Sequence, residues 1–223
     1  MHVSPVANEE TMKSRTFAAS GVFTICAVAV LATALLGGRT LKADEDNDEA
    51  KIKRGFDIAP VKLNLKGKNR ALVGLGSYIV NAKGECNGCH SAGPQTQYVG
   101  LNNPYFGNPE VVNTHTYLGG GRDFGEYPAP GSPIHIVSRN LTPNAAGETL
   151  DGDSFEDFRQ IIRTGVDPDQ IHPVLPFPFD GHLLQIMPWP AYKNMTDRDL
   201  RAIYEYLGAI PCVPGPGASH PCS

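Results

Sequence analysis

The chain has 223 residues, of which 41% are hydrophobic and 19% are charged, and its formal net charge is −4. This length is enough for one hydrophobic core and short for two. The 24 glycines and 19 prolines indicate a loop-rich fold, while 8% aromatic residues and the small net charge exclude a fully disordered chain. The slightly acidic balance argues against a general nucleic-acid binder.

An uncharged apolar run covers residues 16–38, close to the N-terminus. At about 1.5 Å per residue, a helix of this length crosses a hydrocarbon core of about 30 Å. The run is longer than the apolar core of a secretory signal, which has about 7–15 residues. We therefore expect an uncleaved transmembrane anchor at 16–38 that follows a cytoplasmic N-terminus at 1–15. A signal peptide cut after Ala43 is the alternative, and Cys26 is expected to be an inert thiol inside the run.

Two blocks of charge follow the apolar run. Residues 44–49 carry five Asp and Glu, and residues 51–83 carry eight Lys and Arg against Asp57 alone. Residues 84–223 reverse the balance, with seven Lys and Arg against fifteen Asp and Glu. Because charge runs are typical of solvated segments, we predict a charged linker over 39–68. The same charges are also suited to electrostatic steering toward a partner.

Helical signals recur in three places along the remaining chain. Gly76 lies inside the first predicted helix and lowers its helix propensity, which favours a close contact with another helix there. Asp153 or Ser154 is placed to cap the second helix, and Thr196 opens the third with a capping-box pattern. The first predicted helix covers residues 70–82, the second runs from its cap at Asp153 or Ser154 to Gly165, and the third runs from Thr196 to Gly208.

Two longer segments between these helices lack helical signals. Residues 91–150 are rich in Gly and Pro, and we expect at most a short hairpin there, from 115–118 and 134–138. Five prolines between 172 and 191 exclude a helix in that stretch. It is predicted to be an extended loop with an apolar surface.

The sequence CNGCH at residues 86–90 matches the C-x-x-C-H signature of c-type haem attachment. Cys86 and Cys89 lie one helical turn apart, so both thiols can reach the vinyl groups of one porphyrin edge, and His90 can bind the iron. A redox C-x-x-C requires a thioredoxin-like strand and helix, which the sequence does not show. A zinc site requires a second Cys/His pair at close spacing, and His115 and His135 are too isolated. We predict one covalently attached haem c.

Covalent haem attachment takes place outside the cytoplasmic membrane. Residues 39–223 are therefore expected on the periplasmic side, in a compartment that permits disulfides. Cys212 and Cys222 form the remaining pair, because the other three cysteines are assigned to haem and to the apolar run. We expect a disulfide between them that closes the tail at 212–223.

The order of motifs resembles a class I c-type cytochrome domain, with C-x-x-C-H after a first helix and Met-Pro before a last helix. A finer resemblance is to the monohaem domains in cytochrome subunits of membrane-bound alcohol, aldehyde and gluconate dehydrogenases and their single-domain relatives. The residues that carry this resemblance are Gly76, Tyr78–Val80, Leu118–Arg122, Asn140–Pro143, Ser154–Phe158, Arg163, Gly165, Met187–Trp189 and Met195–Leu200.

The resemblance covers residues 70–210 and implies an all-α class I cytochrome c fold with long Gly/Pro-rich loops, at 69–211. Two features depart from it. The dehydrogenase subunits carry three such domains, whereas this chain has one, and the segment 167–186 is longer and richer in Pro. The resemblance therefore supports the domain without fixing a dehydrogenase as the partner.

The resemblance places the second axial iron ligand at Met187. Met187 lies in the Pro-broken apolar loop, nine residues before the helix cap at Thr196. Met195 is an alternative, although its position directly before the cap suits a packing role. Arg122 and Arg139 are candidates for the haem propionates. Five histidines are further alternatives that are most simply surface residues: His115, His135, His172, His182 and His220.

Two functions from different classes remain. Ligation by His90 and Met187 leaves no iron position for a substrate, which favours a membrane-anchored electron-transfer protein rather than an enzyme. The alternative is a haem c enzyme or gas sensor with an open distal site. The expected partners are redox proteins of a membrane-bound electron-transfer complex in a respiratory or photosynthetic chain.

Overall fold

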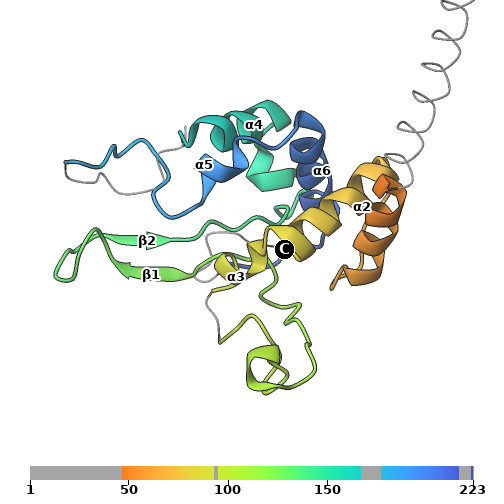
Figure 1. The fold of residues 1–223 in the computed structure, drawn as a ribbon, viewed down its shortest axis with the longest axis horizontal. Helices are drawn as coiled ribbons and strands as arrows, with labels where there is room; N and C mark the ends of the chain where they lie inside the picture. The colour runs from red at the N-terminus through yellow and green to blue at the C-terminus, as the bar shows by residue number, and fades with distance from the viewer. Residues whose placement is uncertain (1–46, 93–94, 167–176, 216–221, 223) are drawn as a thin grey trace, which may run out of the picture. The chain divides into compact units, whose positions relative to one another are not determined.

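The computed structural model describes residues 47–92, 95–166, 177–215 and 222. All of them belong to one compact unit, Asp46–Ser223. Its elements follow the chain in the order shown in Figure 1. They are a helix over residues 47–58, α2 (Arg70–Tyr78), the π-helical turn η1 (Ile79–Lys83), α3 (Cys86–Cys89), the 3-10 turn η2 (Pro104–Phe106), β1 (Asp123–Glu126), β2 (His135–Val137), the 3-10 turn η3 (Thr149–Gly152), α4 (Phe155–Thr164), α5 (Trp189–Tyr192) and α6 (Asp197–Leu207).

Glycines allow three helices to approach one another closely. A Cβ atom on Gly76 of α2 would lie only 1.9 Å from the carbonyl oxygen of Ala202 in α6. A Cβ atom on Gly55, in the helix over 47–58, would lie 1.8 Å from the carbonyl oxygen of Gly74. The close contact predicted at Gly76 is confirmed, and α2 is held between two neighbouring helices.

Side chains at the helix starts bind the free backbone N–H groups. Ser154 begins α4 and Thr196 begins α6, each with a complete capping box in which the N3 carboxylate binds the cap N–H group. Asn69 caps α2 by accepting hydrogen bonds from two backbone N–H groups. Gly165 ends α4 with φ +74°, in the left-handed region that favours glycine. The helices predicted at Ser154 and Thr196 therefore begin at the expected residues, whereas α2 ends at Tyr78 and continues as the π-helical turn η1.

The core lies where α2, α4 and α6 meet the segment around Tyr117. Tyr117 and Tyr206 are almost completely buried, and their hydroxyl groups lie 2.8 Å apart. Asn81 accepts a hydrogen bond from Tyr117 and donates one to Tyr206. Their largest buried neighbours include Val73, Val80, Leu118, Leu200 and Leu207.

The fold is not all-α as expected, because it contains a two-stranded antiparallel sheet in which β1 pairs with β2. The second strand lies within the predicted range 134–138, but residues 115–118 form a turn instead of the first strand. Leu118 has φ +57° and its N–H group donates to the Asn87 side chain, which fixes the turn. The chain becomes extended only after Gly121.

Part of the predicted charged linker at 39–68 is helical in the structure. The helix over 47–58 is bound to the domain by polar contacts as well as by packing. Ser77 donates a buried hydrogen bond to the carbonyl oxygen of Gly55, and Asp48 pairs with Arg198 of α6. These partners are far away in sequence, so local charge alone did not indicate them.

The expected transmembrane helix and single-pass membrane localisation also require correction. No helix within the described residues is long and apolar enough to cross a membrane. The apolar run 16–38, on which that expectation depended, lies outside the described residues.

Candidate functional site

The predicted haem-attachment motif forms a single helical turn. Glu85 precedes it with φ +46°, and α3 then runs from Cys86 to Cys89 and closes with the hydrogen bond from His90 N–H to the Cys86 carbonyl oxygen. Cys86 is half-buried, Cys89 is exposed, and both are free thiols. The turn presents two thiols and one imidazole from consecutive positions, which is the donor set of a c-type haem.

His90 is held in a defined tautomer by a residue from a distant segment. Its Nδ1 lies 2.7 Å from the carbonyl oxygen of Arg139. A carbonyl oxygen can only accept, so Nδ1 carries the proton and Nε2 keeps its lone pair. Desolvation lowers the pKa of His90, and the hydrogen bond to Arg139 opposes that shift. The imidazole is therefore neutral at neutral pH, as iron ligation requires.

The motif is bound tightly to the segment 118–122. Gly120 N–H donates to the His90 carbonyl oxygen over 2.8 Å, and Arg122 Nη1 donates to the Gly88 carbonyl oxygen over 2.6 Å. A Cβ atom on Gly120 would lie 2.5 Å from the backbone of Arg139, so the two chains cross without space for a side chain. The Gly-rich stretch therefore holds the carbonyl that orients His90.

The thiol chemistry does not suit a redox-active C-x-x-C pair. Burial, together with the nearby Cys89, raises the pKa of the Cys86 thiol to about 12. Reactive thiols of redox motifs have lowered pKa values, because the thiolate is the nucleophile. Cys86 therefore lacks the activated thiolate of a redox-active C-x-x-C pair.

Two buried polar atoms next to the motif have no hydrogen-bond partner in the described part of the chain. They are Nδ2 of Asn87 and Oγ of Ser91. Such atoms are rare in complete sites. Asn87 lies inside the motif and Ser91 directly follows His90 in the chain, so these atoms and the donor set fit a site that a further group completes.

The Met187 loop is positioned by the end of α4. Leu184 N–H donates to the Gly165 carbonyl oxygen over 2.8 Å, and Trp189 Nε1 donates to the Leu184 carbonyl oxygen over 3.0 Å. A Cβ atom on Gly165 would lie 2.3 Å from the Trp189 ring. Met187 is half-buried and packs against the main core. Gly165 and Trp189 therefore set the path of the loop that carries Met187.

A hydrogen bond connects this loop to the motif. Tyr192 in α5 donates to the carbonyl oxygen of Gly84 over 3.1 Å, two residues before Cys86. Met195 instead packs against both hydrophobic clusters, including residues of α2. Met195 has the surroundings of a packing residue.

The other candidate residues mostly bind protein groups. Arg139 pairs with Asp153 over 3.3 Å, and the Arg122 guanidinium lies 4.8 Å from the centre of the Phe124 ring. His135 pairs with Asp123 in the hairpin, while His115 and His182 are exposed. His172 and His220 lie outside the described residues. Within the described ranges, no group of three or more His, Cys, Asp or Glu side chains is arranged to hold a metal ion.

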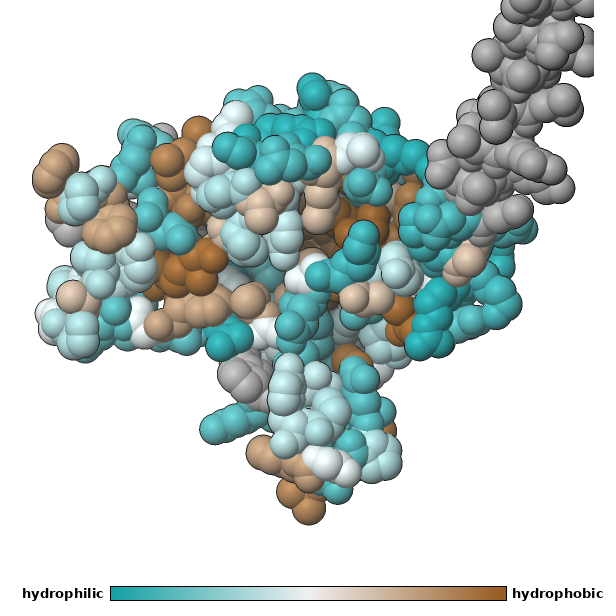
Figure 2. Space-filling view, in the orientation of Figure 1, coloured by the Kyte–Doolittle hydropathy of each residue, from teal (hydrophilic) through white to brown (hydrophobic). Residues whose placement is uncertain are grey.

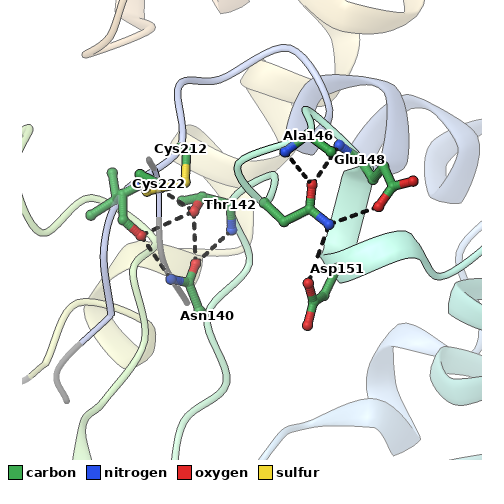
Figure 3. The surroundings of a disulfide bond; sticks show 9 residues. Asn140, Thr142, Ala146, Glu148, Asp151, Cys212 and Cys222 are labelled. Atoms are coloured by element: carbon green, nitrogen blue, oxygen red, sulfur yellow. Dashed lines mark hydrogen bonds between the residues drawn. A yellow bond between two sulfur atoms is a disulfide. The ribbon is translucent and has the colours of Figure 1, made fainter. Parts of the chain in front are cut away.

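Cys212 and Cys222, the pair named from the sequence, form a disulfide with an S–S distance of 2.00 Å (Figure 3). The tail next to it is bound to the segment after Arg139. Asn140 Nδ2 donates to the Val213 carbonyl oxygen over 2.9 Å, and Val213 N–H donates to Thr142 Oγ1 over 3.0 Å. The tail therefore supports Asn140, which follows Arg139, the residue whose carbonyl oxygen contacts His90. The sequence did not indicate this contact.

Comparison with known proteins finds a relative of this chain. The chain is 30% identical over 143 residues to the gluconate 2-dehydrogenase cytochrome c subunit of Pantoea cypripedii. The match covers 62% of this chain and 23% of the relative, so the chain spans about a quarter of that protein's length. No protein-family model matches the chain, and no solved structure matches it. The relationship to a cytochrome c subunit is supported, and it is distant.

Proposed function

We propose that this chain is a monohaem c-type cytochrome that transfers single electrons between redox proteins. Cys86 and Cys89 hold the porphyrin through thioether bonds, and His90 and Met187 are the axial ligands of the iron. The observation that carries the proposal is the His90 Nδ1 contact with the Arg139 carbonyl oxygen, because it leaves Nε2 free in a C-x-x-C-H turn. Haem supplies an iron that changes between the ferrous and ferric states.

The ligand set favours electron transfer over catalysis. An iron bound by both His90 and Met187 would have no position left for a substrate. A thioether ligand raises the reduction potential, which suits a carrier that accepts electrons readily. The proposed function is therefore that of an electron carrier and not of an enzyme. The alternative, a haem c enzyme or gas sensor, requires Met187 to leave the iron accessible.

The distant relative adds support for redox partners. Its name describes a cytochrome subunit of a dehydrogenase, a protein that works within an enzyme complex. The partners we propose for this chain are accordingly redox proteins that give or take one electron at a time.

The proposal is tested with the purified holoprotein. Denaturing mass spectrometry should find one haem bound to the unfolded chain, and Cys86→Ala or Cys89→Ala should each remove one thioether bond. The oxidised protein should show the weak far-red absorption band of methionine bound to ferric iron. A haem that dissociates on denaturation contradicts covalent attachment, and rapid binding of carbon monoxide by the native ferrous protein favours the open-site alternative.

A further inference from the structure

Exposed apolar side chains gather on one ordered loop beside the haem-attachment motif. Seven large hydrophobic residues are highly exposed within the described part of the chain, and five of them lie in the segment 99–111. Figure 2 shows hydrophobic surface at the tip of the lobe that projects past α3, where Figure 1 shows the loop with η2. We call these side chains the loop patch: Val99, Leu101, Tyr105, Phe106 and Val111.

The loop that carries the patch is built as a rigid unit. Tyr98 forms a bridge with Val112, and Val99 N–H donates to the Val111 carbonyl oxygen over 2.9 Å. Asn103 caps η2, and the rings of Tyr98 and Tyr105 pack edge to face at 6.5 Å. Leu101, Tyr105 and Phe106 are 79%, 74% and 71% exposed despite this order. A structured loop that keeps its largest apolar side chains in water is typical of an interaction site.

The loop patch is connected directly to the motif. The Tyr105 hydroxyl donates to Glu85 Oε1 over 3.3 Å, and Glu85 is the residue before Cys86. A Cβ atom on Gly88 would lie 3.3 Å from the same carboxylate oxygen, so Glu85 folds over the motif turn. Cys89 is exposed within this turn. A protein that covers the patch therefore also lies close to the attachment point of the predicted haem.

The two charged side chains that interact with Tyr98 are both acidic. Burial raises the pKa of Tyr98, and the nearby charges of Glu110 and Glu85 add to that shift. The sequence between Lys83 and Arg122 contains no Lys or Arg. Complementarity requires cationic side chains around the apolar centre of the partner.

The size of the patch fits a transient partner rather than a small molecule or a stable dimer. Its exposed apolar area is on the order of 500 Å², below the roughly 800 Å² per side of a standard stable interface. The hollow between Tyr98 and Phe106 has a volume of about 260 Å³, whereas small-molecule sites have about 300–1,000 Å³. A two-fold contact between two copies of this chain would oppose acidic rims.

Resting on the electron-transfer function proposed above, we propose that the loop patch is the docking surface for a redox protein with an apolar centre rimmed by Lys and Arg. The apolar side chains of the patch provide the contact, and Glu85 and Glu110 orient the partner over the motif. This is a brief encounter suited to a carrier that must release each partner after one electron.

Stopped-flow electron exchange tests this surface with three oxidants: a small c-type cytochrome of strongly basic surface, a small iron–sulfur protein of strongly acidic surface, and an uncharged quinone. The wild-type holoprotein should react faster with the basic protein, at a rate that falls as salt rises. The double variant Leu101→Ser/Phe106→Ser should lower that rate constant by about tenfold and leave the quinone rate unchanged. Glu110→Gln should lower it less and flatten its salt dependence.

Matched controls lie outside the patch. Val137→Ser removes another exposed apolar side chain, and Glu49→Gln removes another exposed carboxylate. Both variants should exchange electrons with all three oxidants at the wild-type rates. Equal rate constants for the patch variant and the wild type, or faster exchange with the acidic protein, would overturn the proposal. A dimer in sedimentation that the patch variant abolishes would assign the patch to a second copy and also overturn it.

A cross-linking measurement separates this proposal from the proposed function. Carbodiimide should join the Glu110 carboxylate to a Lys side chain of the basic cytochrome, and the patch variant should reduce this product. If the wild-type chain has no reducible haem but still forms the cross-link, the docking surface stands and only the electron-transfer function is contradicted. Absence of the cross-link in a redox-active holoprotein contradicts only the docking surface.

Discussion

The hydroxyl oxygens of Tyr117 and Tyr206 lie 2.8 Å apart inside the core, although the two residues are 89 positions apart in the chain. Asn81 completes the group through contacts with both hydroxyls. The group joins η1 and α6 to the segment that leads into the Gly-rich stretch. It therefore connects the helical packing to the backbone that holds the motif.

Tyr206→Phe should destabilise the protein by about 1–2 kcal/mol, because it removes one buried hydrogen-bonding group and leaves the other two incompletely paired. Tyr78→Phe is the control, since its hydroxyl has no hydrogen-bond partner among the described residues. Urea unfolding of the holoproteins measures both free energies. Equal stability of Tyr206→Phe and wild type would show that the buried group contributes nothing.

The same tyrosines predict a loss of stability at alkaline pH. Burial raises the pKa of Tyr117 and the pKa of Tyr206 above the ordinary value. The folded state therefore holds these protons more tightly than the unfolded state, and the stabilisation is complete below about pH 10 and is lost as pH rises above it. Unfolding free energy measured from neutral to alkaline pH should fall more steeply for wild type than for Tyr117→Phe/Tyr206→Phe. Parallel curves would contradict the assignment.

Gly165→Ala should displace the Met187 loop. The substitution places a methyl group 2.3 Å from the Trp189 ring at a residue with φ +74°. We expect a loss of about 1–3 kcal/mol of stability and a weaker methionine–iron band. Gly147→Ala is the matched control, because Gly147 has φ +81° and nothing within 4 Å of the added carbon. If both variants keep the full band, the Trp189 contact does not position Met187.

Replacing both disulfide cysteines with Ser should lower the unfolding free energy by about 2–3 kcal/mol, the chain-entropy value for a short loop. The bridge spans ten positions and adjoins the Val213 contacts with Asn140 and Thr142. Thermal and urea unfolding of the oxidised double variant and wild type give the difference. Unchanged stability would mean that the tail is held by its hydrogen bonds alone.

Local signals were sufficient for α4, α6 and the motif turn, but not for the helix over 47–58, which the charge pattern assigned to a linker. The capping residues Ser154 and Thr196 act within one helical turn, so sequence reasoning placed α4 and α6 correctly. The first hairpin strand was misplaced because Leu118 is turned by a hydrogen bond to Asn87, 31 residues away. Likewise, the Arg139 carbonyl that orients His90 lies 49 residues from it, and no local pattern marks a backbone acceptor. Contacts of this kind arise only from the assembled fold.

The axial ligation of the predicted haem is the central claim, and the far-red band of the oxidised holoprotein tests it most directly in three variants. Met187→Ala should abolish the band and allow ferrous iron to bind carbon monoxide, because the thioether is gone. Met187→His should also lose the band, remain six-coordinate and have a lower reduction potential. Met195→Ala should keep the band, since Met195 packs between the two hydrophobic clusters. Loss of the band in Met195→Ala together with its retention in Met187→Ala would contradict the account.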